Sequence, residues 1–163
     1  NAKAGRPAGI QMKLNSLLDE EFVESLYEAS QAGVKVDLVI RGICSLKPGI
    51  PGLSENIHVR SILGRFLEHS RIYHFVNGGD DEYWIGSSDL MHRNLDRRVE
   101  SLVRIDRPAH KTSLQEIFDL SLSDQTASWH QSEEKWLRVA KNAAGEPLQD
   151  LQNLYIKRYK KVH

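Results

Sequence analysis

The sequence of 163 residues has little cysteine and no net charge. Its single cysteine, Cys44, excludes an internal disulfide framework and a cysteine-rich zinc site, and it fits a reducing compartment. The 22 basic and 22 acidic residues cancel, so the total charge does not favour a protein that coats nucleic acid or an anionic membrane. Any anion-binding site must therefore be local.

Long apolar runs are also absent. No stretch approaches the roughly 20 apolar residues of a membrane-spanning helix, and the first residues, NAKAGRPAG, lack the apolar region of a signal peptide. We therefore predict a soluble, cytoplasmic protein whose residues 1–163 form one domain, since the length suits a single core. Because the first residue is not Met, we expect the chain to be a piece of a longer one.

The first forty residues have the pattern of a βαβ unit. Residues Ile10–Asn15 alternate apolar and polar side chains, as in a half-buried strand. Asp19 can cap a helix whose apolar residues recur at helical spacing, and Gly33 is placed to end it. Residues Val36–Ile40 are nearly all apolar, which indicates a strand covered on both faces. An α/β fold with two adjacent parallel strands follows.

Arg41 follows this second strand directly, at the end where ligands collect in parallel sheets. A charge so close to the interior needs a partner, which can be a bound anion or a carboxylate of the protein. The next stretch, residues 42–56, contains several glycines and prolines and is predicted to be a loop. The simplest interpretation of this loop is a surface connection, although the side chain of Lys47 could reach the same anion.

The later part of the chain alternates between short strand and helix patterns. The expected elements are a helical turn within 57–67, a hairpin around Asn77-Gly78, a strand over 97–105, a helix behind a capping box at Thr112–Glu116, a hairpin pairing 128–131 with 135–139, and a helix opened by Pro147.

His69 and Arg71 form the strongest candidate site. They are two residues apart at the start of an apolar run, so both would point to the same side of an extended chain. An imidazole can attack phosphorus or carry a proton near neutral pH, while a guanidinium stays charged and fits phosphate oxygens. The hydroxyls of Ser87 and Ser88, after Gly86, could hold further oxygens. We predict a phosphate site, the alternative being an ordinary core or surface histidine.

His92 is the other histidine surrounded by basic residues, and here a solvated helical turn is favoured over a second catalytic imidazole. The remaining histidines have no partner at a meaningful spacing, and no HExxH pattern is present, so we predict no metal ligands in this chain. The basic tail YIKRYKKVH is typical of a solvated helix end.

Several phrases resemble known families. HSR followed by GSSD is similar to the HxK…GS motif of the phospholipase D superfamily, although Arg71 replaces its lysine and Val76 its aspartate. Longer phrases, in residues 15–49, 65–79 and 85–100, resemble the carboxyl-terminal domain of bacterial polyphosphate kinase, and the similarity covers nearly the whole chain.

This resemblance implies a phospholipase D-like mixed sheet flanked by helices. It also implies a transferase that moves the γ-phosphate of ATP reversibly to inorganic polyphosphate through a phosphohistidine in a preceding domain, so the isolated chain would be inactive. Arg41 would contact substrate and His69 would be the second active-site histidine. Mg²⁺ would bind to ligands outside this chain, and the complete enzyme would be a homo-oligomer, cytoplasmic or associated with a membrane.

Two other functions remain open at this point. One is a phospholipase D-like phosphodiesterase in which two copies bring their His69 residues together across a twofold axis. The other is a noncatalytic module that binds a polyanion other than nucleic acid through a basic face.

Overall fold

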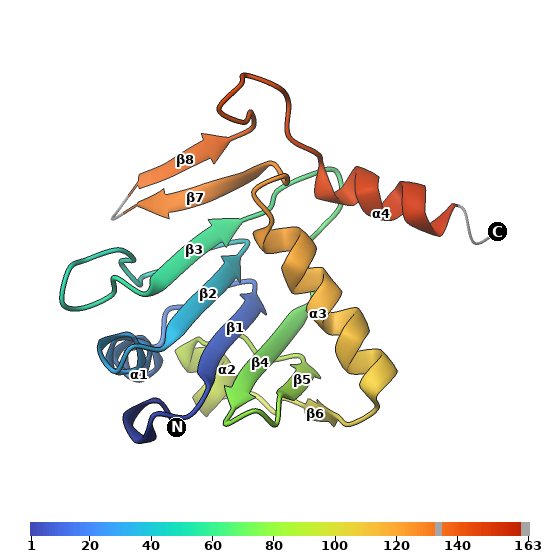
Figure 1. The fold of residues 1–163 in the computed structure, drawn as a ribbon. Coiled ribbons are helices and arrows are strands. Elements are labelled where there is room, and N and C mark those ends of the chain that lie inside the picture. Colours follow the sequence, from blue (N-terminus) through green and yellow to red (C-terminus); the bar gives the residue numbers. More distant parts are fainter. Residues whose placement is uncertain (133–134, 161–163) are drawn as a thin grey trace.

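The computed structural model describes residues 1–132 and 135–160, and its centre is a mixed sheet in the order β6-β5-β4-β1-β2-β3-β7-β8 (Figure 1). The strands are β1 (Ala8–Leu14), β2 (Lys35–Ile40), β3 (Ile57–Ser61), β4 (Arg71–Asn77), β5 (Glu82–Gly86), β6 (Leu102–Ile105), β7 (Ser128–Ser132) and β8 (Lys135–Val139). The helices are η1 (Ala2–Ala4, a 3₁₀ turn), α1 (Glu20–Gln31), α2 (His92–Asp96), α3 (Pro108–Leu122) and α4 (Leu151–Tyr159). The predicted α/β fold is confirmed.

The βαβ unit is confirmed in detail. β1 and β2 pair in parallel through α1, with Leu14 opposite Ile40. The carboxylate of Asp19 accepts a hydrogen bond from the backbone N–H of Phe22 (3.1 Å), which satisfies one of the free donors at the start of α1. Gly33 follows the helix with φ of 82°, a conformation that favours glycine.

The topology brings several strand ends to one edge of the sheet. β3 runs parallel to β2, whereas β4 is antiparallel to β1 and β5 is antiparallel to β4. The hairpin between β4 and β5 turns at Gly78 and Gly79, both with positive φ, as the Asn77-Gly78 signal predicts. The carboxyl ends of β1, β2, β3 and β5 therefore lie at the same edge as the amino end of β4.

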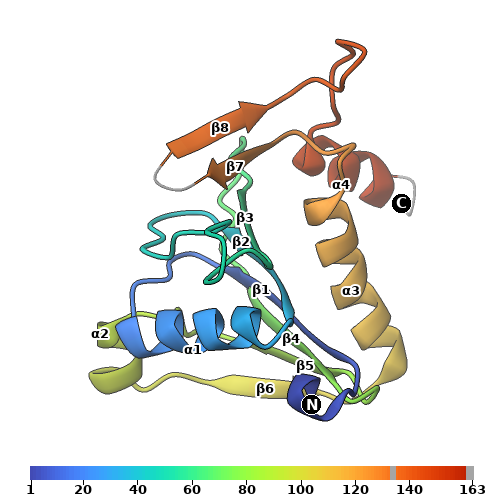
Figure 2. The same ribbon diagram turned by 60° about the vertical axis from the view of Figure 1, so that its left-hand side comes forward.

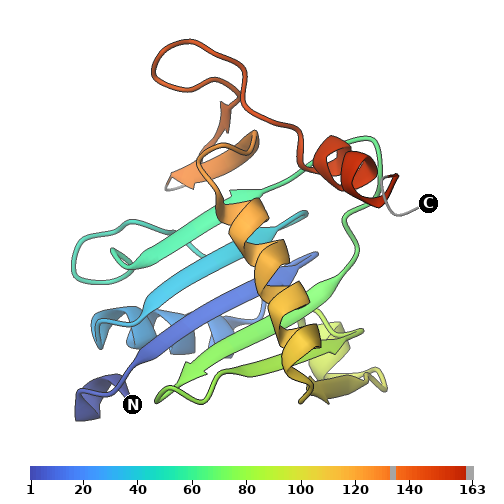
Figure 3. The same ribbon diagram turned by 45° about the vertical axis from the view of Figure 1, so that its right-hand side comes forward.

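Helices cover both faces of the sheet, α1 on one and α3 on the other (Figures 2 and 3). Alternate residues of β2 enter different clusters: Leu38 and Ile40 pack in the core that includes Leu26 of α1, and Val39 packs with Leu151 of α4. β2 is buried from Val36 to Ile40. The expectation of a strand covered on both faces is confirmed.

The helical turn predicted within 57–67 is wrong. Residues Ile57–Ser61 form β3, in which buried Ile57, Val59 and Ser61 alternate with more exposed side chains. This period of two is that of a strand, and pairing with β2 extends the parallel part of the sheet. Residues 62–70 then form an irregular loop that carries His69 to the sheet edge.

Two helix starts also differ from prediction. α3 begins at Pro108, ahead of the expected capping box, because proline is well suited to the first turn of a helix. The hydroxyl of Thr112 donates to the carbonyl of Pro108 (3.1 Å) inside the helix instead of capping it. α4 begins at Leu151 instead of at Pro147, and the Asp150 side chain accepts from the N–H of Asn153 (2.8 Å).

The remaining expectations are met in part. β6 occupies only the second half of the strand predicted over 97–105. β7 and β8 form the expected antiparallel pair, while its turn at 133–134 and the last tail residues, 161–163, lie outside the described residues. Across residues 1–132 and 135–160, no helix has the length and apolar character needed to cross a membrane.

Candidate functional site

Five polar residues from distant parts of the chain meet at the sheet edge described above. Asn15 follows β1, Arg41 follows β2, His69 precedes β4, Arg71 opens β4, and Asp89 comes shortly after β5. Hydrogen bonds connect all five in one network. We call these residues the edge cluster.

Asp89 is the centre of the edge cluster and is only 2% exposed. Arg71 donates to both carboxylate oxygens, from Nη2 to Oδ2 (2.9 Å) and from Nε to Oδ1 (3.3 Å). The backbone N–H of Asn15 adds a bond to Oδ1 (2.7 Å). Burial opposes ionisation, but the hydrogen bonds from Arg71 and Asn15 outweigh it and hold the pKa of Asp89 below its usual range. Asp89 is therefore an anion fixed by two partners.

Arg71 also positions His69. Its Nη1 lies 2.9 Å from His69 Nδ1 and donates to the His69 carbonyl (3.0 Å). Nη1 also lies 3.4 Å from His69 Nε2, and because a guanidinium can only donate, a ring nitrogen of His69 acts as the acceptor. The ring is exposed to solvent. His69 can thus present an N–H to a ligand at the sheet edge.

Arg41 has a different environment. Its Nε donates to Asn15 Oδ1 (3.1 Å), and no carboxylate lies within ion-pair distance among residues 1–132 and 135–160. The salt-bridge alternative for Arg41 is therefore absent from the described part of the chain. The side chain lines a cavity of about 230 Å³ together with residues 62–68. A half-buried guanidinium without a carboxylate, beside a cavity, suits an anionic ligand.

The glycine after Arg41 is required by this arrangement. A Cβ on Gly42 would lie 2.8 Å from the backbone oxygen of Asn15, closer than side-chain atoms approach a carbonyl. The N–H of Gly42 donates to that oxygen (2.7 Å). The close approach of the two loops holds Arg41 next to Asn15.

Ser87 and Ser88 contact protein groups in this structure. The hydroxyl of Ser87 is hydrogen bonded to Glu100, whose other oxygen accepts from Asn94 (2.6 Å). The hydroxyl of buried Ser88 donates to the carbonyl of Asp89 (2.9 Å). Both serines thus support the loop that carries Asp89, and a direct contact to phosphate stays a prediction.

His92 and Lys47 lie apart from the edge cluster. His92 opens α2, is 83% exposed and pairs with Asp96 one turn later (2.8 Å), so the predicted solvated turn is confirmed. Lys47 lies in the loop after β2, where its backbone N–H donates to the hydroxyl of Tyr27 (2.9 Å). Its approach to an anion stays a prediction.

The described residues do not fit a divalent cation. No group of three or more His, Cys, Asp or Glu side chains in this part of the chain is arranged to hold a metal ion. Asp89, the one buried carboxylate of the edge cluster, already accepts from Arg71 and Asn15. Binding of Mg²⁺ to another part of a longer chain stays an expectation.

Sequence reasoning missed Asn15 and Asp89. Asn15 ends β1 at the same edge where Arg41 ends β2, so its position in the βαβ unit was an available signal. In the sequence, Asp89 could be recognised only as the last residue of the GSSD motif. The two lie 74 residues apart, and no local pattern links them.

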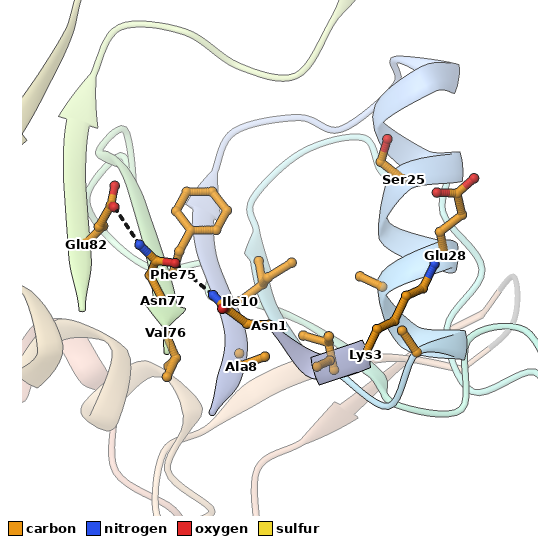
Figure 4. Close-up of a pocket in the computed structure, with 15 residues that line it drawn as sticks. Asn1, Lys3, Ala8, Ile10, Ser25, Glu28, Phe75, Val76, Asn77 and Glu82 are labelled. Atoms are coloured by element: carbon orange, nitrogen blue, oxygen red, sulfur yellow. Dashed lines mark hydrogen bonds between the residues drawn. The ribbon is translucent and has the colours of Figure 1, made fainter. Parts of the chain in front are cut away.

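A separate, larger cavity lies at the amino end of β1. It has a volume of about 580 Å³ and is bounded by η1, α1 and β4, with Lys3, Glu28 and Phe75 in its lining (Figure 4). Its polar groups bond to one another, Asn1 to Asn77 (2.8 Å) and Asn77 to Glu82 (3.0 Å). None of the edge cluster residues lines it, so it is separate from the candidate site.

The chain is similar to known polyphosphate kinases. The family model described as "Polyphosphate kinase C-terminal domain 2" matches residues 1–150. Polyphosphate kinase of Streptomyces coelicolor is 56% identical over 155 residues, which are 94% of this chain and 21% of the relative. That of Thermosynechococcus vestitus is 49% identical over 146 residues, which are 90% and 20%. The chain thus spans about a fifth of these relatives.

Solved structures show the same relation. The crystal structure of polyphosphate kinase from Porphyromonas gingivalis superposes with a TM-score of 0.88 at 34% identity, over all of this chain and 25% of that one. Nuc from Salmonella typhimurium, a phospholipase D family member, gives a TM-score of 0.55 at 16% identity, over 85% of this chain and 87% of that one. The latter shows a shared fold alone, which confirms the phospholipase D-like architecture. From the matched domain model and the identity over most of its length, the chain belongs to the polyphosphate kinase family, in which it corresponds to the second carboxyl-terminal domain.

Proposed function

We propose that this chain is the domain of a polyphosphate kinase that holds phosphate groups during reversible transfer of the γ-phosphate of ATP to inorganic polyphosphate. The edge cluster is the observation that supports the proposal: Arg41 has no carboxylate partner among the residues that the structure describes, and His69 is held by the Arg71–Asp89 pair. Similarity to polyphosphate kinases over most of the chain supports the choice of reaction.

Arg41 is the residue proposed to bind the transferred or neighbouring phosphate. Phosphoryl transfer needs chiefly correct positioning and neutralisation of the charge on the phosphate oxygens. The guanidinium offers a planar set of donors that matches two such oxygens. Its one side-chain bond to a described residue, to Asn15, uses Nε and leaves Nη1 and Nη2 for the ligand.

His69 is proposed to act as a hydrogen-bond donor or proton carrier at the same phosphate. The ring nitrogen of His69 that does not accept from Arg71 is the group available to a phosphate oxygen. Arg71 and Asp89 are positioning residues in this scheme, because Nε and Nη2 of Arg71 are bonded to the carboxylate and Nη1 to His69. A direct contact of Arg71 with substrate stays part of the proposal.

The attacking group is proposed to lie in another domain. The chain covers about a fifth of its relatives, and the resemblance stated above assigns the phosphorylated histidine to the preceding domain. The natural polypeptide would therefore supply a second histidine, the Mg²⁺ ligands and the surface for homo-oligomer formation. Alone, residues 1–163 would bind phosphate groups without transferring them.

Both other functions are less well supported. A phospholipase D family member shares the fold at only 16% identity, whereas the polyphosphate kinase of Streptomyces coelicolor is 56% identical to the chain. A noncatalytic module would not need a histidine whose ring is oriented by a buried ion pair. Catalysis by His69 explains that orientation.

Two histidine variants in the natural polypeptide test the proposal. His69→Ala should lower the rate of polyphosphate synthesis from ATP by about 10²- to 10⁴-fold, the range for loss of general acid–base catalysis. His92→Ala is the matched control, since His92 is exposed and pairs with Asp96 and Asp19 outside the edge cluster, and its rate should remain near that of the wild type. An active His69→Ala with an inactive His92→Ala would contradict the proposal.

A further inference from the structure

The loop of residues 62–70, between β3 and β4, carries His69 and also lines the cavity of about 230 Å³ at the edge cluster. It forms no helix or strand, and beyond its first residue no backbone–backbone hydrogen bond links it to the described part of the chain. Its large apolar side chains do not anchor it either, because Leu63, Phe66 and Leu67 are each more than half exposed. Polar side chains must therefore hold this loop, and with it His69, in place.

The amide of Gln152 supplies such an anchor from α4, which lies beside the loop (Figure 3). Its Oε1 accepts from the backbone N–H of Phe66 (2.8 Å), and its Nε2 donates to the Phe66 carbonyl (2.8 Å). These two bonds satisfy both backbone groups of one residue, as a neighbouring strand would. Nε2 also donates to the carboxylate of Glu68 (2.8 Å), the residue before His69. Gln152 is only 6% exposed, so these bonds are shielded from competing water.

Two further features fit this anchor. Glycine at position 64 leaves room for the amide, since a Cβ on Gly64 would lie 2.5 Å from Gln152 Oε1. The second oxygen of Glu68 pairs with Nζ of Lys13 (3.0 Å), a buried side chain of β1, so the same carboxylate joins the loop to the sheet. The loop is therefore fixed to both α4 and β1 immediately before His69.

We propose that Gln152 is a positioning residue for His69, because its amide holds the loop so that the imidazole stays at the sheet edge beside Arg71. Its bonds go to the loop and not to the edge cluster, and it lies beyond residues 1–150, which match the family model. The inference rests on the proposed role of His69 and adds the residue that keeps His69 in place. A small displacement of a reacting group lowers the rate strongly, whereas Arg41 would still bind the phosphate, so loss of the anchor should lower kcat more than it raises KM.

Gln152→Met in the natural polypeptide tests the anchor, because methionine keeps the length of the side chain and has no amide. The kcat for polyphosphate synthesis from ATP should fall by about 10- to 100-fold, while the KM for ATP should change by less than about threefold. Hydrogen exchange followed by mass spectrometry should be faster in the peptide that contains Phe66, whose N–H loses its acceptor. Unchanged exchange in this peptide would overturn the anchor itself.

The same substitution in a His69→Ala background separates positioning from a general loss of structure. A residue that acts through His69 has no imidazole left to position, so Gln152→Met should lower the residual rate by less than about threefold. An equal loss of rate in both backgrounds would overturn the proposal. Full activity of His69→Ala alone would instead contradict the proposed function, while faster exchange at Phe66 would still show that Gln152 anchors the loop.

Gly64→Ala disturbs the anchor from the loop side and keeps the test decisive if Gln152→Met does not fold. The added Cβ displaces the end of a flexible side chain, so kcat should fall in the same way with little change in melting temperature. Gln115→Met is the matched control, because it removes an amide of α3 that bonds to two described side chains away from the loop. It should lower the melting temperature and leave kcat unchanged. A normal kcat in both Gly64→Ala and Gln152→Met would overturn the proposal.

Discussion

Arg41 and Arg71 lie at the same edge of the sheet, but their guanidinium groups have opposite surroundings. Arg71 bonds to both oxygens of buried Asp89 and to His69, whereas the one side-chain bond of Arg41 within the described part of the chain goes to the amide oxygen of Asn15. An arginine that pairs with a carboxylate stabilises the folded structure, whereas an arginine without such a partner is available to a ligand. The two residues therefore separate the scaffold of the site from its binding surface.

Loss of Asp89 should have the largest effect, because it removes the centre of the scaffold. Asp89→Ala leaves the half-buried charge of Arg71 unpaired, which should lower the free energy of unfolding by about 3 kcal/mol and the melting temperature by roughly 6 to 12 °C. Polyphosphate synthesis should fall as well, since His69 loses its orientation. Thermal unfolding followed by circular dichroism measures the first effect.

Asp96→Ala is the control for Asp89→Ala. Asp96 also pairs with a basic side chain, that of His92, but both residues are exposed. Surface pairs of this kind contribute at most about 1 kcal/mol, so the melting temperature should change little. Equal melting temperatures for the two variants would show that Asp89 is not the centre of the scaffold.

Arg41→Ala should affect turnover and not stability. Loss of one contact to the phosphate in the transition state should lower the rate of transfer about 10²- to 10³-fold. The melting temperature should stay near that of the wild type, because the side chain has no ion pair to lose among the described residues. Arg41→Lys should recover only part of the rate, since an ammonium cannot form the two-pronged contact.

The opposite pattern would contradict the comparison of the two arginines. If Arg41→Ala unfolds as easily as Asp89→Ala and keeps a normal rate of transfer once folded, Arg41 belongs to the scaffold.

A double-mutant cycle should give a smaller but more specific effect. Arg71→Ala and Asp89→Ala remove the two partners of one pair, so their combined loss of stability should be smaller than the sum by about 1 to 3 kcal/mol. Arg41→Ala combined with Asp89→Ala should be closer to additive, because Asn15 alone connects the two side chains among the described residues. Equal coupling energies for both pairs would remove the distinction between scaffold and binding surface.

The sequence predicted the parts of the fold that depend on local pattern. β1, α1 and β2 were recognisable because strand alternation, the Asp19 cap and the apolar run of β2 each act within a few residues. β3 was missed because Ile57–Ser61 is short and follows a long loop, and its strand identity comes from pairing with β2. The start of α3 was misplaced because Pro108 at the first turn outweighed the capping box.

The candidate site was predictable only in its binding residues. Arg41 and His69 could be chosen because each lies next to a strand end, which is a local signal. Arg71 could be chosen with His69, but Asn15 and Asp89 could not, because the bonds of Asp89 to Asn15 and Arg71 depend on the register of strands far apart in sequence. For the same reason, Arg71 and Arg41 have the same expected role when only the sequence is considered.

The smallest effect that tests the comparison is the response to acid. Hydrogen bonds from Arg71 and Asn15 hold the pKa of Asp89 below its value in the unfolded chain, so ionised Asp89 stabilises the fold above that value and the contribution is lost as the pH falls through the folded pKa. Asp89→Asn removes this dependence of stability on pH, because the amide does not ionise. Urea unfolding should therefore show a difference in stability between wild type and Asp89→Asn that is constant above about pH 5 and narrows below about pH 4. Asp96→Asn is the control and should follow the wild type throughout. If the difference in stability between wild type and Asp89→Asn does not decrease in acid, the charge of Asp89 is not what holds Arg71 in place.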